Sequence, residues 1–293
     1  MINNANNILI GIDGGGTGCR VAIANRQGER LGDAKGGPAN PTYQPQEALD
    51  NILAAIEAAR LDAGLDKATL AAAHAFIGLA GIRDDEIAQF ITTALPIKRA
   101  RVVEDRVTTV TGALAGGDGA VAAIGTGSFI ARTAQGGTQY IGGWGFRLGD
   151  QASGAWLGHM LLRQVVLCVE GVENHTALTR EAMAHYGGDA GKVFDFSNTA
   201  TPAEFGDLAP LVVDAAGDGD QTATTLMRSG ADYIVKALTT LGYQADIPLC
   251  LTGGLGPHYA AFLPPSYGAK VVKPKGTALD GALILAAQMD ITP

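Results

Sequence analysis

The feature that most limits the possible fold is a glycine-rich turn, GIDGGGTGCR at residues 11–20, set between two short apolar segments. Residues 8–12 and 21–24 have the composition of β-strands, so the turn joins two neighbouring strands. A second turn at residues 25–28 leads into a further strand at about residues 30–34. The chain is therefore predicted to open as an antiparallel meander of three strands.

Helices and strands alternate after this meander. The hydrophobic patterns predict helices at about residues 45–63, 84–94 and 107–115, with strands at about 73–79 and 99–105 between them. This order is typical of an α/β domain, which we expect to span residues 1–116.

The pattern then restarts after the sequence GGDG at residues 116–119. A shift of 109 positions aligns Gly16-Thr17-Gly18 with Gly125-Thr126-Gly127, and Gly28 with Gly137, which indicates two related halves. The second domain is expected at residues 117–293. It has predicted helices at about 153–170, 220–241 and 278–289, and predicted strands at 247–254 and near 270–272.

The first glycine turn has the composition of an anion-binding site. Glycine accepts unusual backbone angles and has no side chain, so at Gly14, Gly15 and Gly16 backbone N–H groups can converge on a phosphate, to which Thr17 can add a hydroxyl. Asp13 would repel a bare phosphate, so we expect a divalent cation beside it, bound through water. The alternative is a plain tight hairpin with a turn-favouring aspartate.

Two further glycine clusters strengthen the hypothesis of a nucleotide site. A second turn can bind a polyphosphate from the opposite side of a cleft; its residues are Gly125, Thr126, Gly127 and Ser128. A third cluster follows the predicted strand at 247–254, where small residues would let a nucleoside approach; its glycines are Gly253, Gly254 and Gly256.

These three motifs, GIDGGGTGCR, GTGS at 125–128 and LTGGLG at 251–256, resemble the two phosphate motifs and the adenosine motif of the actin-like ATPase superfamily. The resemblance implies an α/β fold with two ribonuclease H-like domains and a central cleft, and ATP and Mg²⁺ as cofactors. The segment GTALDGALILA at 276–286 is similar to the closing helix of that fold. We therefore expect a helix at about 277–290 to pack at or cross the hinge.

Within this superfamily the chain resembles the N-acetylglucosamine and glucosamine kinase branch, grouped with the BadF/BadG/BcrA/BcrD ATPases. The matching segments are GGPAN at 36–40, GLAG at 78–81, VVED at 102–105 and GGWGFRLGDQASG at 142–154. The resemblance implies transfer of the γ-phosphate of ATP to the 6-hydroxyl of N-acetylglucosamine or glucosamine, by a homodimer.

Asp105 is the candidate general base. It follows an apolar strand, so it should lie at the carboxyl edge of a sheet, where α/β proteins bind their ligands. An aspartate before a helix could equally serve as its N-cap, and the residues alone leave both roles open. The resemblance implies the catalytic role. Glu104 and Ala80 depart from the family pattern, and the missing polar contact at Ala80 leaves the choice between the two sugars open.

The segment at 142–154 and the loop at 36–40 supply the candidate sugar ligands, which by resemblance are Asn40, Gly143, Trp144 and Asp150. A carboxylate can bind sugar hydroxyls, and an indole can lie against the apolar face of a sugar. From the residues alone, Asp150 could simply start the following helix, and Trp144 could belong to the core.

Composition limits the classes of partner that the protein can bind and indicates its cellular location. The net charge of −8, without any run of lysine or arginine, argues against nucleic acid and against anionic membranes as partners. No segment has the length and apolarity of a membrane span, and the first residues lack the pattern of a secretory signal, so a cytoplasmic location is expected.

Two other functions are considered. An ATPase activator of a 2-hydroxyacyl-CoA dehydratase or benzoyl-CoA reductase needs cysteines that bind an iron–sulfur cluster. Cys19, Cys168 and Cys250 lie far apart without a metal-binding spacing, and we expect them to be buried. A regulatory nucleotide-binding module without chemistry is disfavoured by the presence of both Asp13 and Asp105.

Overall fold

The structure, a computed structural model, describes residues 7–42, 44–82, 84–135 and 137–289. The chain divides into two compact units. Unit 1 comprises the chain up to Gly117 together with the chain from Pro274 onward, and unit 2 comprises Asp118–Lys273. The second domain was expected to continue to residue 293, whereas unit 2 ends at Lys273.

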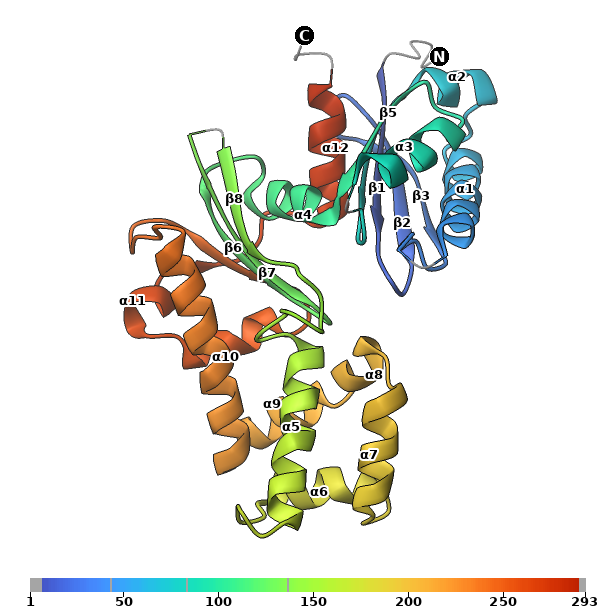
Figure 1. The fold of residues 1–293 in the computed structure, drawn as a ribbon. Helices are drawn as coiled ribbons and strands as arrows, with labels where there is room; N and C mark the ends of the chain where they lie inside the picture. The colour runs from blue at the N-terminus through green and yellow to red at the C-terminus, as the bar shows by residue number, and fades with distance from the viewer. Residues whose placement is uncertain (1–6, 43, 83, 136, 290–293) are drawn as a thin grey trace. The chain divides into compact units, whose positions relative to one another are not determined.

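Unit 1 contains a five-stranded mixed sheet with the order β3-β2-β1-β4-β5 (Figure 1). The three strands of the meander are antiparallel, and β4 and β5 continue the sheet in parallel with β1. The strands are β1 (Ile8–Gly14), β2 (Cys19–Asn25), β3 (Arg30–Gly36), β4 (His74–Leu79) and β5 (Arg99–Glu104). The helices are α1 (Pro45–Asp62), α2 (Lys67–Ala72), α3 (Asp85–Ala94), α4 (Asp105–Leu114) and α12 (Ala278–Gln288).

The alternation of side chains along β1 explains how helices cover both faces of this sheet. Ile8, Ile10 and Ile12 point into a core shared with α1 and α3. Leu9 points to the opposite face, where a smaller apolar cluster includes residues of α12. Gly11 lies on that face too, and a β-carbon there would lie only 2.9 Å from the carbonyl oxygen of Leu279. Helix α12 therefore packs directly on the strand before the first glycine turn.

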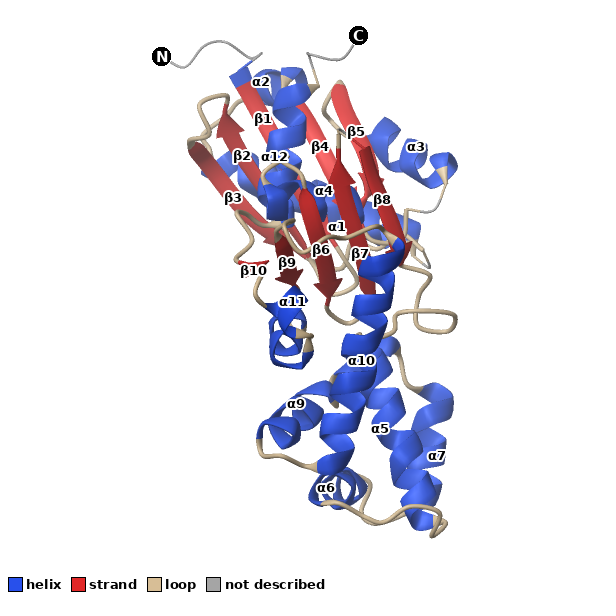
Figure 2. Cartoon of the chain, turned by 90° about the vertical axis from the view of Figure 1, so that its left-hand side faces the viewer, coloured by secondary structure: helices blue, strands red, loops and turns tan. Residues whose placement is uncertain are grey.

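Unit 2 repeats the same sheet topology, with the order β10-β9-β6-β7-β8 (Figure 2). Its strands are β6 (Gly119–Ile124), β7 (Ser128–Ala134), β8 (Gly137–Gly142), β9 (Leu249–Thr252) and β10 (Val271–Val272). Strands β6 and β7 are antiparallel and β9 is parallel to β6, as β1, β2 and β4 are related in unit 1. This shared topology supports the two related halves inferred from the shift of 109 positions.

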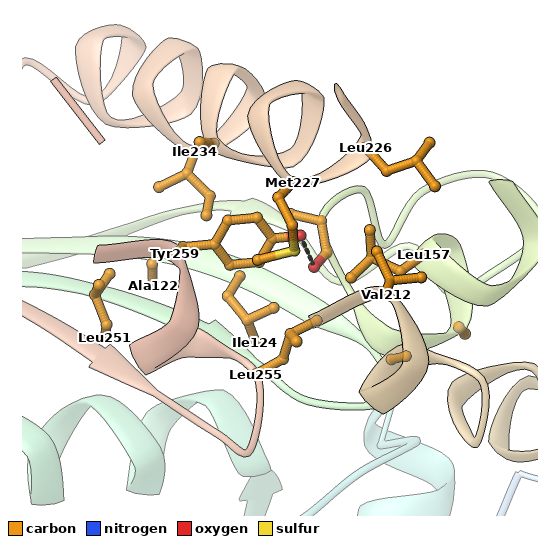
Figure 3. Close-up of a cluster of buried hydrophobic side chains, with 14 of the residues drawn as sticks. Ala122, Ile124, Leu157, Val212, Leu226, Met227, Ile234, Leu251, Leu255 and Tyr259 are labelled. Carbon is orange, nitrogen blue, oxygen red and sulfur yellow. Dashed lines mark hydrogen bonds between the residues drawn. The ribbon is translucent and has the colours of Figure 1, made fainter. Parts of the chain in front are cut away.

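The helices of unit 2 gather largely at one end of its sheet (Figure 2). They are α5 (Gly154–Val169), α6 (Ala177–His185), α7 (Ala190–Thr199), α8 (Pro202–Gly206), α9 (Ala209–Gly217), α10 (Gln221–Thr240) and α11 (Pro265–Gly268), with a 3₁₀-helix, η2 (Gly256–Phe262). One apolar core joins β6 and β9 to α10 and η2 through Ile124, Leu251, Met227 and Tyr259 (Figure 3). In the part of the chain that is described, no helix is both long and apolar enough to cross a membrane.

Candidate functional site

The first glycine turn lies between β1 and β2 in unit 1. Asp13 is paired within the sheet with Arg20 on β2 and Gly78 on β4, so it is a strand residue and not a turn residue. Gly14 is needed for packing, because a β-carbon there would lie 2.6 Å from the Leu79 side chain. The plain-hairpin alternative therefore does not explain this aspartate.

Beyond Gly14 the turn is open. A β-carbon at Gly15 or Gly16 would meet no atom within 4 Å, and Thr17 is exposed. The N–H group of Gly15 donates to the Gly18 carbonyl at 2.9 Å, so it is already engaged within the hairpin. The open part that an anion could approach is therefore centred on Gly16 and Thr17.

Two other sequence motifs meet this turn inside unit 1. The N–H of Ala39 donates to the Gly15 carbonyl, and the N–H of Ala80 donates to the Gly14 carbonyl. Gly81 has a φ of 89° and leaves room for Asn40, whose Oδ1 would lie 2.2 Å from a β-carbon at that position. The segments 36–40 and 78–81 are thus brought together beside the first turn.

Asp105 is the first helical residue of α4, directly after β5. Glu104 occupies the N-cap position of this helix without a side-chain capping bond, so the N-cap role considered for Asp105 is not observed. Glu104 is instead paired with Arg106. The carboxyl of Asp105 is partly buried and accepts a hydrogen bond from the backbone N–H of Arg106.

The electrostatics of unit 1 favour proton exchange at Asp105. Burial, and then the negative charges of Asp13 and Glu104, raise the pKa of Asp105 from 3.8 to about 6. Burial also raises the pKa of Asp13, an effect that the charge of Arg20 partly offsets. A carboxyl with a pKa near 6 is ionised at neutral pH and can accept a proton there more readily than an ordinary aspartate.

In unit 2 the second glycine turn is fixed against the start of α5. The N–H groups of Gly154 and Ala155 donate to the carbonyls of Gly125 and Thr126, at 2.8 and 3.2 Å. Thr126 is exposed at the tip of the turn. Ser128 is buried, and its hydroxyl donates to the Gln151 carbonyl at 2.7 Å, so this hydroxyl is engaged within the unit.

The third glycine cluster lies beside the second. Gly253 has a φ of 79°, and a β-carbon there would lie 2.2 Å from the Ile124 carbonyl oxygen, so the two motifs touch through their backbones. Gly254 is open, whereas Gly256 packs against Leu251. The cluster leads into the 3₁₀-helix η2.

Thr252, at the end of β9, lies within the motif LTGGLG, but it was not among the candidate site residues predicted from the sequence. Its hydroxyl is buried and finds no hydrogen-bond partner among the described residues. A buried polar group normally has a partner, so this hydroxyl is a candidate to bind a ligand. Its position between two apolar residues and two glycines gave no signal in the sequence.

The loop from Gly142 to Ser153 holds the other candidate ligands. Trp144 is 75% exposed, which excludes the core position considered for it. Gly143 donates its N–H to the Ser128 carbonyl at 2.9 Å. The side chain of Ser153 accepts the Trp156 N–H and caps α5, so Asp150 does not start this helix.

Asp150 itself is buried in a strained backbone conformation. Its φ is 58° and that of Ala152 is 69°, values that cost non-glycine residues about 1–3 kcal/mol each. Burial raises the pKa of Asp150, an effect that the backbone hydrogen bonds from Ser128 and Gly145 partly offset. Such strain, kept in place by surrounding contacts, is typical of functional segments.

Comparison with known proteins identifies the family of this chain. The sequence profile of the BadF/BadG/BcrA/BcrD ATPase family matches residues 10–283. The chain belongs to the BadF/BadG/BcrA/BcrD ATPase family. This membership confirms the family resemblance and the expected use of ATP.

Individual relatives of this BadF/BadG/BcrA/BcrD ATPase match it over nearly their full length. Glucosamine kinase GspK of Vibrio cholerae is 34% identical over 284 residues, which is 96% of each chain. The structure of a Chromobacterium violaceum protein assigned as an N-acetylglucosamine kinase is also 34% identical, with a TM-score of 0.89, and the match covers 97% of this chain and 100% of that one.

A more distant structure has the same fold. A ROK family glucokinase from Streptomyces griseus, solved with glucose and AMPPNP, matches with a TM-score of 0.58 at 17% identity, over 96% of this chain and 98% of that one. The expected α/β fold with two actin-like ATPase domains is thereby confirmed.

Proposed function

We propose that this protein is an ATP- and Mg²⁺-dependent amino-sugar kinase that phosphorylates the 6-hydroxyl of glucosamine or N-acetylglucosamine. The observation that carries the proposal is the carboxyl of Asp105, poised by its surroundings to accept a proton, in a chain 34% identical to a glucosamine kinase over nearly its whole length. The similarity to a protein assigned as an N-acetylglucosamine kinase supports the second sugar.

Asp105 acts as the general base in this proposal. The hydroxyl proton of the sugar passes to the Asp105 carboxylate while the sugar oxygen bonds to the γ-phosphorus, and the bond from that phosphorus to the β–γ bridging oxygen breaks. The products are ADP and the sugar 6-phosphate. Positioning and charge neutralisation provide most of the catalysis in such a reaction.

The nucleotide residues follow from the two glycine turns. The open positions at Gly16, Thr17, Gly125 and Thr126 support contact with phosphate oxygens. Gly14, Gly15, Gly127 and Ser128 complete the two proposed phosphate-binding turns, although the Gly15 N–H and the Ser128 hydroxyl are engaged within the protein. The adenosine would bind along Gly253, Gly254 and Gly256. The unpartnered hydroxyl of Thr252 supports a ligand at this position.

The residues of unit 1 fit Mg²⁺ held loosely. No group of three or more metal-binding side chains occurs among the described residues. Mg²⁺ commonly keeps several waters and binds one or two carboxylates together with substrate phosphates, so this set is compatible with it. Asp13 would hold the ion through water, and the bound ion would neutralise phosphate charge.

The residues proposed to bind the amino sugar are Asn40, Gly143, Trp144 and Asp150. Asp150 and Asn40 supply polar groups for the sugar hydroxyls, and exposed Trp144 supplies an apolar surface. A cytoplasmic homodimer completes the proposal, and sedimentation analysis of the purified protein tests the dimer.

The activator alternative has less support. Cys19, Cys168 and Cys250 are all buried, whereas a cluster shared between two subunits needs cysteines at the surface. Iron analysis of the purified protein checks this directly, because an activator would contain iron and a kinase would not.

The decisive experiment measures ADP release over a panel of hexoses, hexosamines and N-acetylhexosamines, with Asp105→Asn beside the wild type. We expect release to depend on glucosamine or N-acetylglucosamine and to fall at least about 100-fold in the variant. Asp195→Asn on α7 is the matched control, because Asp195 is exposed. Absence of sugar-stimulated release would refute the proposed function, and full activity of Asp105→Asn would remove Asp105 as the base.

A further inference from the structure

Three consecutive residues of unit 2 are each fixed by a separate contact. The Asp150 carboxylate accepts a hydrogen bond from the backbone N–H of Ser128. The Gln151 carbonyl accepts the Ser128 hydroxyl at 2.7 Å, and the Ala152 carbonyl accepts the Tyr259 hydroxyl at 2.7 Å. Two of these three residues have a left-handed backbone, so their conformation depends on such contacts.

Tyr259 is well suited to fix this segment. Its side chain is fully buried in the core of unit 2, where its hydroxyl reaches the loop (Figure 3). Gly230 on α10 makes room for it, since a β-carbon there would lie 2.3 Å from the hydroxyl oxygen. Burial raises the pKa of Tyr259 well above its ordinary value, so the hydroxyl stays protonated and donates.

The hydrogen bond from Tyr259 to the Ala152 carbonyl has no replacement in bulk water. Ala152 is fully buried, so its carbonyl cannot exchange this partner for bulk water. Phe146 fixes the first part of the same loop through ring contacts with His159 and Phe205, at centroid distances of 5.5 and 5.1 Å. Tyr259 contacts the other end of the loop, beside the residue proposed to bind the sugar.

We propose that Tyr259 is a positioning residue for sugar binding, which holds the 150–152 segment so that the Asp150 carboxylate keeps its place beside the second glycine turn. The inference rests on the proposed function, in which Asp150 binds a sugar hydroxyl. Without the tyrosine hydroxyl, the Ala152 carbonyl loses its partner and the strained segment relaxes. Asp150 then moves away from its binding position.

The test compares Tyr259→Phe with the wild type. The substitution keeps the ring and its apolar contacts, so the unit still folds. We expect the KM for the amino sugar to rise about five- to tenfold, with kcat and the KM for ATP changed less than about twofold. Tyr243→Phe is the matched control, because Tyr243 is also buried and donates to a carbonyl, that of Ile247, at 2.9 Å. All its constants should stay within about twofold.

A second measurement does not depend on activity. Arg147 is exposed in the same loop, so trypsin cleavage after Arg147, followed by mass spectrometry, reports how firmly the loop is held. We expect this cleavage to be at least about fivefold faster in Tyr259→Phe, with other sites unchanged.

The outcomes separate the inference from the proposed function. A wild type that releases no ADP with any sugar refutes the proposed function, while the cleavage comparison still decides whether Tyr259 holds the loop. An unchanged sugar KM in Tyr259→Phe, or equal cleavage after Arg147, overturns the inference. Faster cleavage at every site with a parallel rise in both KM values also overturns it, because Tyr259 would then support only general stability.

Discussion

The ionised carboxyl of Asp105 is expected to lower the free energy of unfolding of the protein. Its pKa of about 6 lies above the 3.8 of an ordinary aspartate, a difference of about two pH units that corresponds to at most about 3 kcal/mol. Because the folded state keeps the proton to higher pH than the unfolded chain does, stability falls as pH rises from about 4 to about 6. Above about pH 6 the full cost of the buried negative charge remains.

Asp105→Asn removes this cost. We expect the free energy of unfolding at pH 8 to be up to about 3 kcal/mol higher in the variant, and the difference to shrink toward zero near pH 4, where the wild-type carboxyl is protonated. Urea unfolding followed by circular dichroism measures both values, in the presence of EDTA so that no metal ion compensates the charge.

Asp195→Asn, a substitution of an exposed aspartate, is again the control. Asp195→Asn should change the free energy of unfolding by less than about 0.5 kcal/mol at either pH. If Asp105→Asn is no more stable than the wild type at pH 8, or if its advantage is the same at pH 4 and pH 8, the electrostatic argument for Asp105 is wrong. A stabilised but inactive variant would show that this carboxyl is retained for chemistry.

Two further predictions concern the base and the helix packing of unit 1. Sugar-dependent kcat/KM should fall about tenfold per pH unit below the pKa of Asp105, about 6. Glu104→Gln should shift this fall to lower pH, because it removes one negative charge near Asp105. A flat profile down to pH 5 would contradict both predictions. Gly281→Ala would place a β-carbon 2.0 Å from the Thr108 carbonyl oxygen, so we expect about 2–3 kcal/mol of destabilisation in urea unfolding, whereas Gly217→Ala, with nothing within 4 Å, should be neutral or slightly stabilising. Equal stability of the two alanine variants would contradict the tight crossing of α4 and α12.

The sequence predicted the long helices of unit 2 closely. The helix expected at about 153–170 is α5 at Gly154–Val169, and the helix expected at about 220–241 is α10 at Gln221–Thr240. Both helices extend over several turns, so their hydrophobic period is visible in the sequence.

The four helices between α5 and α10 were not predicted. They have only 5 to 10 residues each, so fewer than three turns are available to show a period. Local signals were present, since Thr201 and Glu204 form a capping box at the start of α8.

The candidate site also has features that the sequence predicted and features that it did not. The glycine turns are local in sequence and could be found from composition alone. The contact between Tyr259 and Ala152 joins residues 107 positions apart, and the left-handed backbone at Ala152 occurs at a residue that rarely adopts it. Neither feature has a local pattern, because each depends on the packed core of unit 2.

The division of unit 1 between two distant parts of the chain has a consequence for synthesis on the ribosome. Unit 2 is continuous and can fold as soon as it emerges, whereas the sheet of unit 1 waits for α12, which ends at Gln288, to cover Leu9 and Phe76. About 170 residues separate Gly117 from the end of α12, which takes roughly 10 to 30 seconds to translate. During that interval the half made first has an uncovered apolar face, which exposes the nascent chain to aggregation until α12 is made.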